Sequence, residues 1–412
     1  MVSRKHGLAV VGIATMLLVG TACSDSEAGK PGPGAPQSSS TPGASTTPGA
    51  STDPSDNPAA ASIAVVPAKG AKAVAPDKPV TVTTSVGTIK SVTLKDDDGG
   101  TVDGTLNADK TVWTAGPGVK PGVTYTLSGS AEGTDGASVP ISSTFSTLKA
   151  TKSLKASVVP LNGETVGVAL PIQIYWNNPV TDRAAVEKRL KVTTSAKTTV
   201  EGSWRWVNSK QVNYRPKTYW PAGIKVTVNI DTAGVNAGNG TWGAASREIK
   251  FATGKSVITD IDVKKHTMRV TIDGKLARTI PITAGKSGFT TRSGVKVIME
   301  KFATKRMDAR TVGIKPGDPE YYDIHDVKWA QRVTSSGEFI HGAPWSSGSQ
   351  GSENVSHGCV GMSLANGQWY FNQTLRGDPV VVTGTTRHMT EGNGWTDWNL
   401  PYAKYKEGSA LG

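Results

Sequence analysis

Cysteine is nearly absent from this sequence, which has only Cys23 and Cys359 among its 412 residues. So few thiols exclude a disulfide scaffold, a cysteine-based zinc cluster and an iron–sulfur centre. Acidic residues are also few: the chain has 33 of them against 45 lysines and arginines, so its formal net charge is +12. Apolar residues at 37% and 47 glycines give a globular composition, which excludes a polytopic membrane protein and a disordered chain. At about 150 residues per domain, the length predicts about three domains.

Long hydrophobic runs are lacking except for one at the N-terminus. A basic start precedes an apolar run over residues 7–20, and Cys23 follows shortly after it. The run is shorter than the roughly 20 residues that a membrane-spanning helix needs, so residues 1–22 are predicted to be a secretory signal peptide. Its end at Cys23 resembles a bacterial lipoprotein signal, whose cysteine is acylated. Gly20 departs from the leucine usual at that position, and the alternative is an ordinary signal peptide with an incidental cysteine.

Residues 23–61 have the composition of a tether. They are mainly Ser, Thr, Pro, Gly and Ala, with no aromatic residue. Such a segment buries too little apolar surface to offset the entropy of ordering it. We therefore expect a disordered linker between Cys23 and the folded domains.

The next two hundred residues read as two similar units of short alternating strands. The segment 121–127 of the first unit corresponds to 222–228 of the second, and both follow a period of two with β-branched residues. Each unit has the size of an immunoglobulin-like (Ig-like) β-sandwich. We predict one such domain over residues 62–150 and another over residues 151–254.

Two groups of aromatic residues need an explanation. Those of the second unit form either a glycan-binding platform or sandwich core and interdomain packing: Trp204, Trp206, Tyr214, Tyr219 and Trp220. Those near the C-terminus are predicted to dock the tail against the domain before it: Trp395, Trp398, Tyr402 and Tyr405.

The densest polar signal pairs Cys359 with a histidine. His341 is followed by fourteen residues, 342–355, and then by Ser-His-Gly-Cys359. A free cysteine has a pKa of about 8.5, so an adjacent histidine can accept its proton and hold a thiolate. Gly358 lets the backbone approach a substrate, and the N–H groups of Gly358 and Cys359 are candidate oxyanion donors. A buried structural cysteine is the alternative, but this thiol stands among polar and flexible residues.

The segment from His341 to Cys359 resembles the signature of the L,D-transpeptidases, whose catalytic domain is of the YkuD type. Similar stretches surround it: residues 339–346, 354–360, 368–371 and 394–402. The resemblance implies a β-sandwich catalytic domain over residues 255–384, with a C-terminal tail, 385–412, packed on it. The expected fold class is therefore all-β, with two Ig-like sandwiches before a YkuD-type sandwich.

The resemblance also implies roles for single residues. Cys359 corresponds to the nucleophile, His341 to the general base and acid, and Gly342 to the residue whose backbone carbonyl orients the imidazole. Further positions correspond to the substrate site: Met307, Tyr322, Trp345, Ser356, His357 and Gly361. Gly361 departs from the pattern, because the family usually has Asn there.

The activity that the resemblance implies is peptidoglycan L,D-transpeptidation. A Cys359 thioester would form with release of D-Ala, and a neighbouring stem peptide would resolve it into a 3→3 cross-link. Stem peptides are the expected partners and carbapenem-type β-lactams the expected covalent inhibitors, with no cofactor, metal or nucleic acid. The alternatives are an L,D-carboxypeptidase that uses water and a catalytically weak wall-binding lipoprotein. The expected location is the outer face of the cell membrane, within the wall, with lipid on Cys23.

Overall fold

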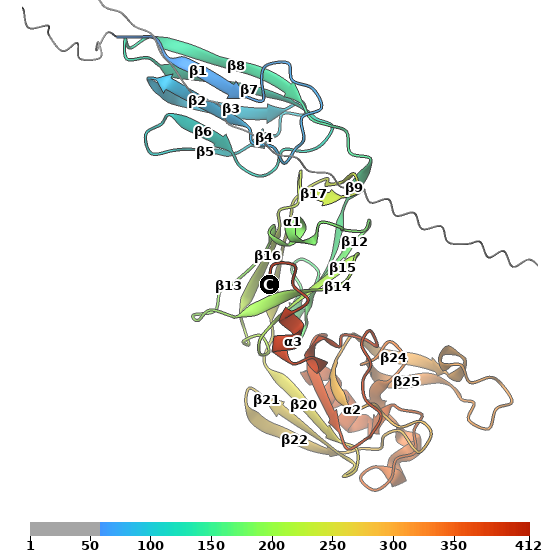
Figure 1. Ribbon diagram of the computed structural model, residues 1–412. Helices are drawn as coiled ribbons and strands as arrows, with labels where there is room; N and C mark the ends of the chain where they lie inside the picture. Colours follow the sequence, from blue (N-terminus) through green and yellow to red (C-terminus); the bar gives the residue numbers. More distant parts are fainter. Residues whose placement is uncertain (1–57) are drawn as a thin grey trace, which may run out of the picture. The chain divides into compact units, whose positions relative to one another are not determined.

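The computed structural model describes residues 58–412 (Figure 1). The predicted signal peptide, Cys23 and most of the predicted tether lie outside the described residues. The last residues of that tether differ from the prediction, because the Ala59 N–H donates to Thr134 Oγ1 at 2.8 Å and Ala61 is buried. They pack with the first sandwich, so the predicted tether is too long at this end. No helix within residues 58–412 is long and apolar enough to cross a membrane.

The first domain is a sandwich of two four-stranded sheets, blue to teal in Figure 1. One sheet has the order β1 (Ser62–Val66), β2 (Thr81–Val86), β6 (Val112–Ala115) and β5 (Gly104–Leu106). The other has the order β4 (Thr101–Val102), β3 (Thr88–Asp96), β7 (Thr124–Glu132) and β8 (Ser138–Ser146). Alternate residues of β7 and β8 face inward, where Tyr125 and Phe145 stack with ring centroids 5.5 Å apart.

The second domain repeats this arrangement with a small addition. One sheet has the order β10 (Ala156–Val159), β12 (Ile172–Trp176), β15 (Gln211–Pro216) and β14 (Gly202–Asn208). The facing sheet has the order β11 (Thr165–Val166), β19 (Arg247–Thr253), β16 (Lys225–Ile230) and β13 (Leu190–Thr194). A third sheet consists of β17 (Asn236–Gly238), β18 (Thr241–Gly243) and β9 (Lys152–Leu154), and one short helix is α1 (Arg183–Glu187).

The aromatic residues of the second domain are mainly core. Trp204, Trp206, Tyr214 and Trp220 are buried between its sheets. Tyr219 is less buried and meets the ring of Trp398 edge-on at 4.6 Å. The packing interpretation is therefore confirmed for the four buried rings, because they offer no exposed face to a glycan.

The third domain holds the predicted site on two further sheets. The five-stranded sheet has the order β22 (Lys275–Pro281), β21 (Thr267–Ile272), β20 (Val257–Asp262), β28 (Pro379–Thr383) and β23 (Gly294–Val297). The four-stranded sheet has the order β24 (Glu300–Asp308), β25 (Asp323–Arg332), β26 (Phe339–Gly342) and β27 (Val360–Met362). Helix α2 (Leu364–Gln373) follows β27, and the Ser363 side chain caps it by accepting the Asn366 N–H. The predicted all-β fold of three sandwiches is confirmed.

The C-terminal tail contacts two domains. It contains η3 (Asp397–Asn399) and α3 (Tyr402–Lys406). The Asn399 side chain bonds the backbone N–H and C=O of Val295 in the third domain. The predicted docking on the third domain is thus incomplete, because the aromatic end of the tail packs on the second domain. There the Arg215 guanidinium lies 4.7 Å from the Trp398 ring centre and 4.6 Å from that of Tyr405.

Candidate active site

Two adjacent strands bring Cys359 and His341 together. Strand β26 is buried along its whole length and carries His341, while Cys359 directly precedes β27. The two strands pair in parallel with His341 opposite Gly361, so Cys359, two residues earlier, shares the face of His341. Both side chains line one cavity of about 460 Å³.

His341 is oriented by the residue that follows it. Its ring is buried, and Nδ1 lies 2.8 Å from the carbonyl oxygen of Gly342. A carbonyl can only accept, so Nδ1 carries the proton and Nε2 keeps a lone pair. Burial lowers the pKa of His341, and the hydrogen bond to Gly342 opposes that shift without cancelling it. The imidazole is therefore neutral at pH 7 and is ready to accept a proton.

The surroundings of Cys359 favour the protonated thiol. Burial raises its pKa to about 11, and a backbone hydrogen bond from Phe339 opposes this shift. The sulfur lies 3.8 Å from the carbonyl oxygen of Gly337. The thiolate–imidazolium pair expected from the sequence therefore stays a prediction. The two pKa shifts favour a thiol beside a neutral imidazole instead, because desolvation disfavours both charged forms.

The residues predicted to contact substrate lie around this cavity. Its lining includes all six of them: Met307, Tyr322, Trp345, Ser356, His357 and Gly361. Several lining residues were not predicted from the sequence: Thr283, Ile324, Ala343, Ser346, Ser349 and Val355. Trp345 is the second residue of the 3-10 helix η2 (Pro344–Ser349), and its ring lies 5.7 Å from that of His341.

A second cavity meets the nucleophile from another side. It has about 240 Å³ and shares Cys359, Met307 and Tyr322 with the first cavity. Its lining also includes three cationic side chains, Lys305, Arg306 and Arg332. The sulfur therefore borders two spaces of different polarity.

The segment that carries Tyr322 is fastened to the site by ion pairs. The Glu320 carboxylate accepts hydrogen bonds from Lys286 Nζ and His357 Nε2, each at 2.7 Å. The same two partners lower the pKa of Glu320. The His357 ring also packs between Phe289 and Tyr322, with centroid distances of 4.6 and 4.9 Å. Glu320 lies two residues before Tyr322, in the segment 318–323 that resembles the family, whereas no local pattern marks Lys286 and Phe289.

Gly361 has no room for a side chain. A Cβ atom at this position would lie 2.9 Å from Ala343 Cβ and 3.1 Å from Thr283 Cγ2. Its backbone N–H and C=O both pair with Thr283. Gly361 replaces the asparagine usual in the family, and the neighbouring side chains pack too closely here for a larger residue.

Only one of the two predicted oxyanion donors is available. The Gly358 N–H donates to Ser356 Oγ at 3.1 Å, and that hydroxyl donates to the Cys359 carbonyl at 2.6 Å. Gly358 has φ +120°, which a residue with a side chain rarely adopts. Within residues 58–412, no hydrogen bond is donated by the Cys359 N–H. The prediction is therefore corrected for Gly358, because its N–H is already engaged.

Within residues 58–412, no group of three or more His, Cys, Asp or Glu side chains could hold a metal ion.

Comparisons with known proteins agree with this geometry. Residues 71–236 match the bacterial Ig domain family, and residues 256–382 match the L,D-transpeptidase catalytic domain family, YkuD. L,D-transpeptidase 2 of Mycobacterium tuberculosis is 35% identical over 342 residues, which cover 83% of this chain and 83% of that protein. L,D-transpeptidase 5 of M. tuberculosis is 34% identical over 363 residues, which cover 86% of this chain and 78% of that protein.

A solved structure of the L,D-transpeptidase LdtMt1 in complex with imipenem is 37% identical in sequence. It covers 56% of this chain and 99% of its own, with a TM-score of 0.48. The two M. tuberculosis relatives match at more than 30% identity over most of their length, and the catalytic-domain match contains both His341 and Cys359. The chain therefore belongs to the L,D-transpeptidase family and is an L,D-transpeptidase.

Proposed function

We propose that this enzyme forms 3→3 cross-links in peptidoglycan through a thioester on Cys359. The observation that carries the proposal is the pair of a partly buried thiol and an imidazole in one cavity, with the imidazole oriented by Gly342. A neutral base beside a neutral thiol creates the thiolate only when it is needed.

In the first half-reaction, His341 Nε2 takes the Cys359 proton as the sulfur attacks the carbonyl before the terminal D-Ala of a tetrapeptide stem. The carbonyl oxygen becomes an oxyanion, which the Cys359 N–H faces. The C–N bond then breaks, and His341 returns the proton to the leaving amine. D-Ala departs, and the stem remains as a thioester.

In the second half-reaction, an amine on the third residue of another stem attacks the thioester. His341 takes a proton from that amine and gives it to the departing Cys359 sulfur. The products are an amide between the two stems and the resting thiol. Cys359 lines two cavities, so the acceptor stem can approach the thioester through one cavity while the donor stem occupies the other.

Imipenem tests the nucleophile directly. Its strained amide should acylate Cys359 by addition, so the intact mass of the protein should rise by the mass of one imipenem. The Cys359→Ala variant should gain no mass, and the His341→Ala variant should react far more slowly. The proposal fails if the wild-type protein gains no mass, or if the adduct survives in Cys359→Ala.

We also propose that the mature protein is exported and held at the outer face of the membrane by lipid on Cys23. The support is the basic start, the short apolar run and the position of the cysteine. Metabolic labelling with palmitate should mark the wild-type protein and not a Cys23→Ser variant. Equal labelling of the two would refute the anchor.

A further inference from the structure

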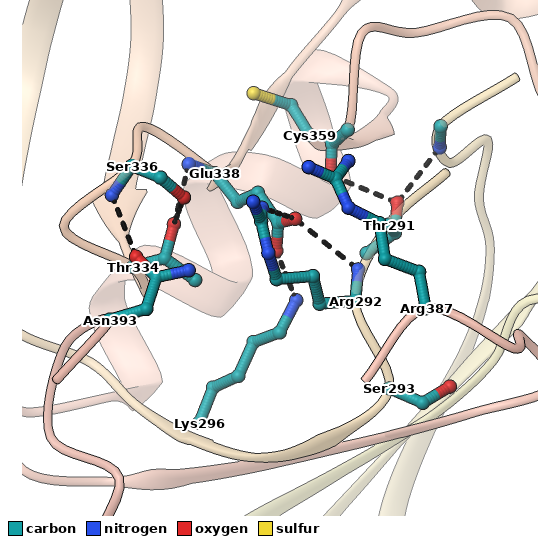
Figure 2. A network of polar contacts seen from close by, with 12 residues as sticks. Thr291, Arg292, Ser293, Lys296, Thr334, Ser336, Glu338, Cys359, Arg387 and Asn393 are labelled. Carbon is teal, nitrogen blue, oxygen red and sulfur yellow. Dashed lines mark hydrogen bonds and ion pairs between the residues drawn. The ribbon is translucent and has the colours of Figure 1, made fainter. Parts of the chain in front are cut away.

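A threonine outside the sequence motif holds the backbone of the nucleophile. Thr291 is fully buried, and its Oγ1 accepts the Gly285 N–H at 2.8 Å. The same oxygen donates to the carbonyl of Gly358 at 2.9 Å (Figure 2). A hydroxyl has one proton and a carbonyl only accepts, so these two partners fix the direction of the hydroxyl.

This contact sets the direction of the Cys359 amide. The peptide between Gly358 and Cys359 is planar and trans, so its N–H points opposite to its C=O. Because the carbonyl is bonded to Thr291, the Cys359 N–H is turned away from Thr291. Figure 2 shows the Cys359 sulfur also directed away from Thr291. The Cys359 N–H and the Cys359 sulfur therefore both point away from Thr291.

A buried ion-pair network fixes Arg292, the residue that follows Thr291. One Glu338 oxygen accepts from the backbone N–H of Arg292 at 3.2 Å and from its Nη1 at 2.7 Å. The other oxygen accepts from Lys296 Nζ at 2.5 Å (Figure 2). Glu338 and Lys296 are only 4% and 1% exposed. The Glu338 carboxylate, bonded also to Lys296, therefore fixes both the backbone and the side chain of Arg292, next to Thr291.

We propose that Thr291 is a positioning residue for acyl transfer, which aims the Cys359 N–H at the developing oxyanion by holding the Gly358 carbonyl. The inference rests on the proposed thioester mechanism. It adds a residue 68 positions before the nucleophile, and the hydroxyl of that residue bonds backbone groups of Gly285 and Gly358.

Two reactions of the same sulfur separate this role from a structural one. Acylation by imipenem passes through an oxyanion and depends on the amide donor. Alkylation by iodoacetamide displaces iodide from carbon, so no oxyanion forms and the amide donor is not used. A misdirected Cys359 N–H should slow the first reaction and leave the second unchanged.

The experiment measures both rates on full-length protein. Thr291→Val removes the hydroxyl and keeps the shape, so its acylation should fall about 10- to 100-fold while its alkylation stays within about twofold of wild type. Thr291→Ser keeps the hydroxyl and should restore acylation to within about threefold. Thr259→Val is the matched control, because Thr259 is equally buried but bonds Tyr370 away from the site. It should change neither rate.

Each outcome decides the inference. If Thr291→Val is acylated at the wild-type rate, or if its acylation and alkylation rates fall equally, the inference is overturned. If Thr291→Val does not fold, Thr291→Ala replaces it. If neither folds while Thr291→Ser does, the hydroxyl serves folding and the inference is overturned. Absence of acylation in the wild-type protein would instead refute the proposed function, so the two failures are distinguishable.

Discussion

His341 Nδ1 lies 2.8 Å from the carbonyl oxygen of Gly342, the residue that follows it in the chain. The contact places the proton on Nδ1 and leaves the lone pair on Nε2 available to accept a proton. The carbonyl belongs to the backbone, so a glycine at position 342 can supply it.

The pH dependence of acylation follows from this ring. Burial lowers the pKa of His341 from its ordinary value of 6.5, so the base stays neutral below that pH. We expect the rate of imipenem acylation to be level from about pH 6.5 to 8 and to fall only as the pH drops through the lowered pKa, where the imidazole gains a proton. A rapid-quench mass profile across pH measures this. An acid limb centred above pH 6.5 would show that the ring is not desolvated.

Alkylation of Cys359 reports the charge of the resting thiol. Burial raises its pKa to about 11, and only the thiolate is strongly nucleophilic. The iodoacetamide rate should therefore rise about tenfold per pH unit between about pH 7 and 10. A rate that is fast and flat above about pH 6 would instead indicate a preformed thiolate–imidazolium pair.

Much of the chemistry could be predicted from the sequence because it lies in one short motif. Cys359 and His341 are eighteen residues apart, and a parallel strand pair brings them together. Thr291 and Glu338 could not be predicted, because their contacts with Gly358 and Arg292 depend on how separate segments pack. The thiolate–imidazolium pair was predicted from residue spacing alone, and spacing carries no information about the desolvation that shifts both pKa values. The target of the aromatic tail was likewise a matter of tertiary packing.

A side chain at Gly361 should destabilise the third domain. Its Cβ would lie 2.9 Å from that of Ala343, and neither backbone can move without breaking strand pairing. We expect Gly361→Ala to cost about 1–3 kcal/mol and Gly361→Asn more, measured from urea unfolding of this domain. Gly348→Ala is the control, because nothing lies within 4 Å of its added Cβ. A more active and equally stable Gly361→Asn would mean that the missing asparagine, not the packing, limits the enzyme.

Glu320 should matter for binding rather than for chemistry. Its carboxylate fastens the segment of Tyr322 to Lys286 and His357, but it is partly exposed and screened by solvent. Glu320→Gln should raise the donor KM about two- to fivefold and leave kcat near wild type. Asp326→Asn is the matched control, because its ion pair with Lys328 lies on the surface. A large loss of kcat in Glu320→Gln would place the carboxylate in the chemical step instead.

The most direct test of the central claim is the product formed from a purified disaccharide-tetrapeptide. The thioester mechanism predicts dimers with a bond between the third residues of the two stems, and one D-Ala released for each dimer. Tandem mass spectrometry locates the bond, and Cys359→Ala should give no dimer. Tripeptide monomers with D-Ala and no dimer would contradict cross-linking, because water would then be the acceptor.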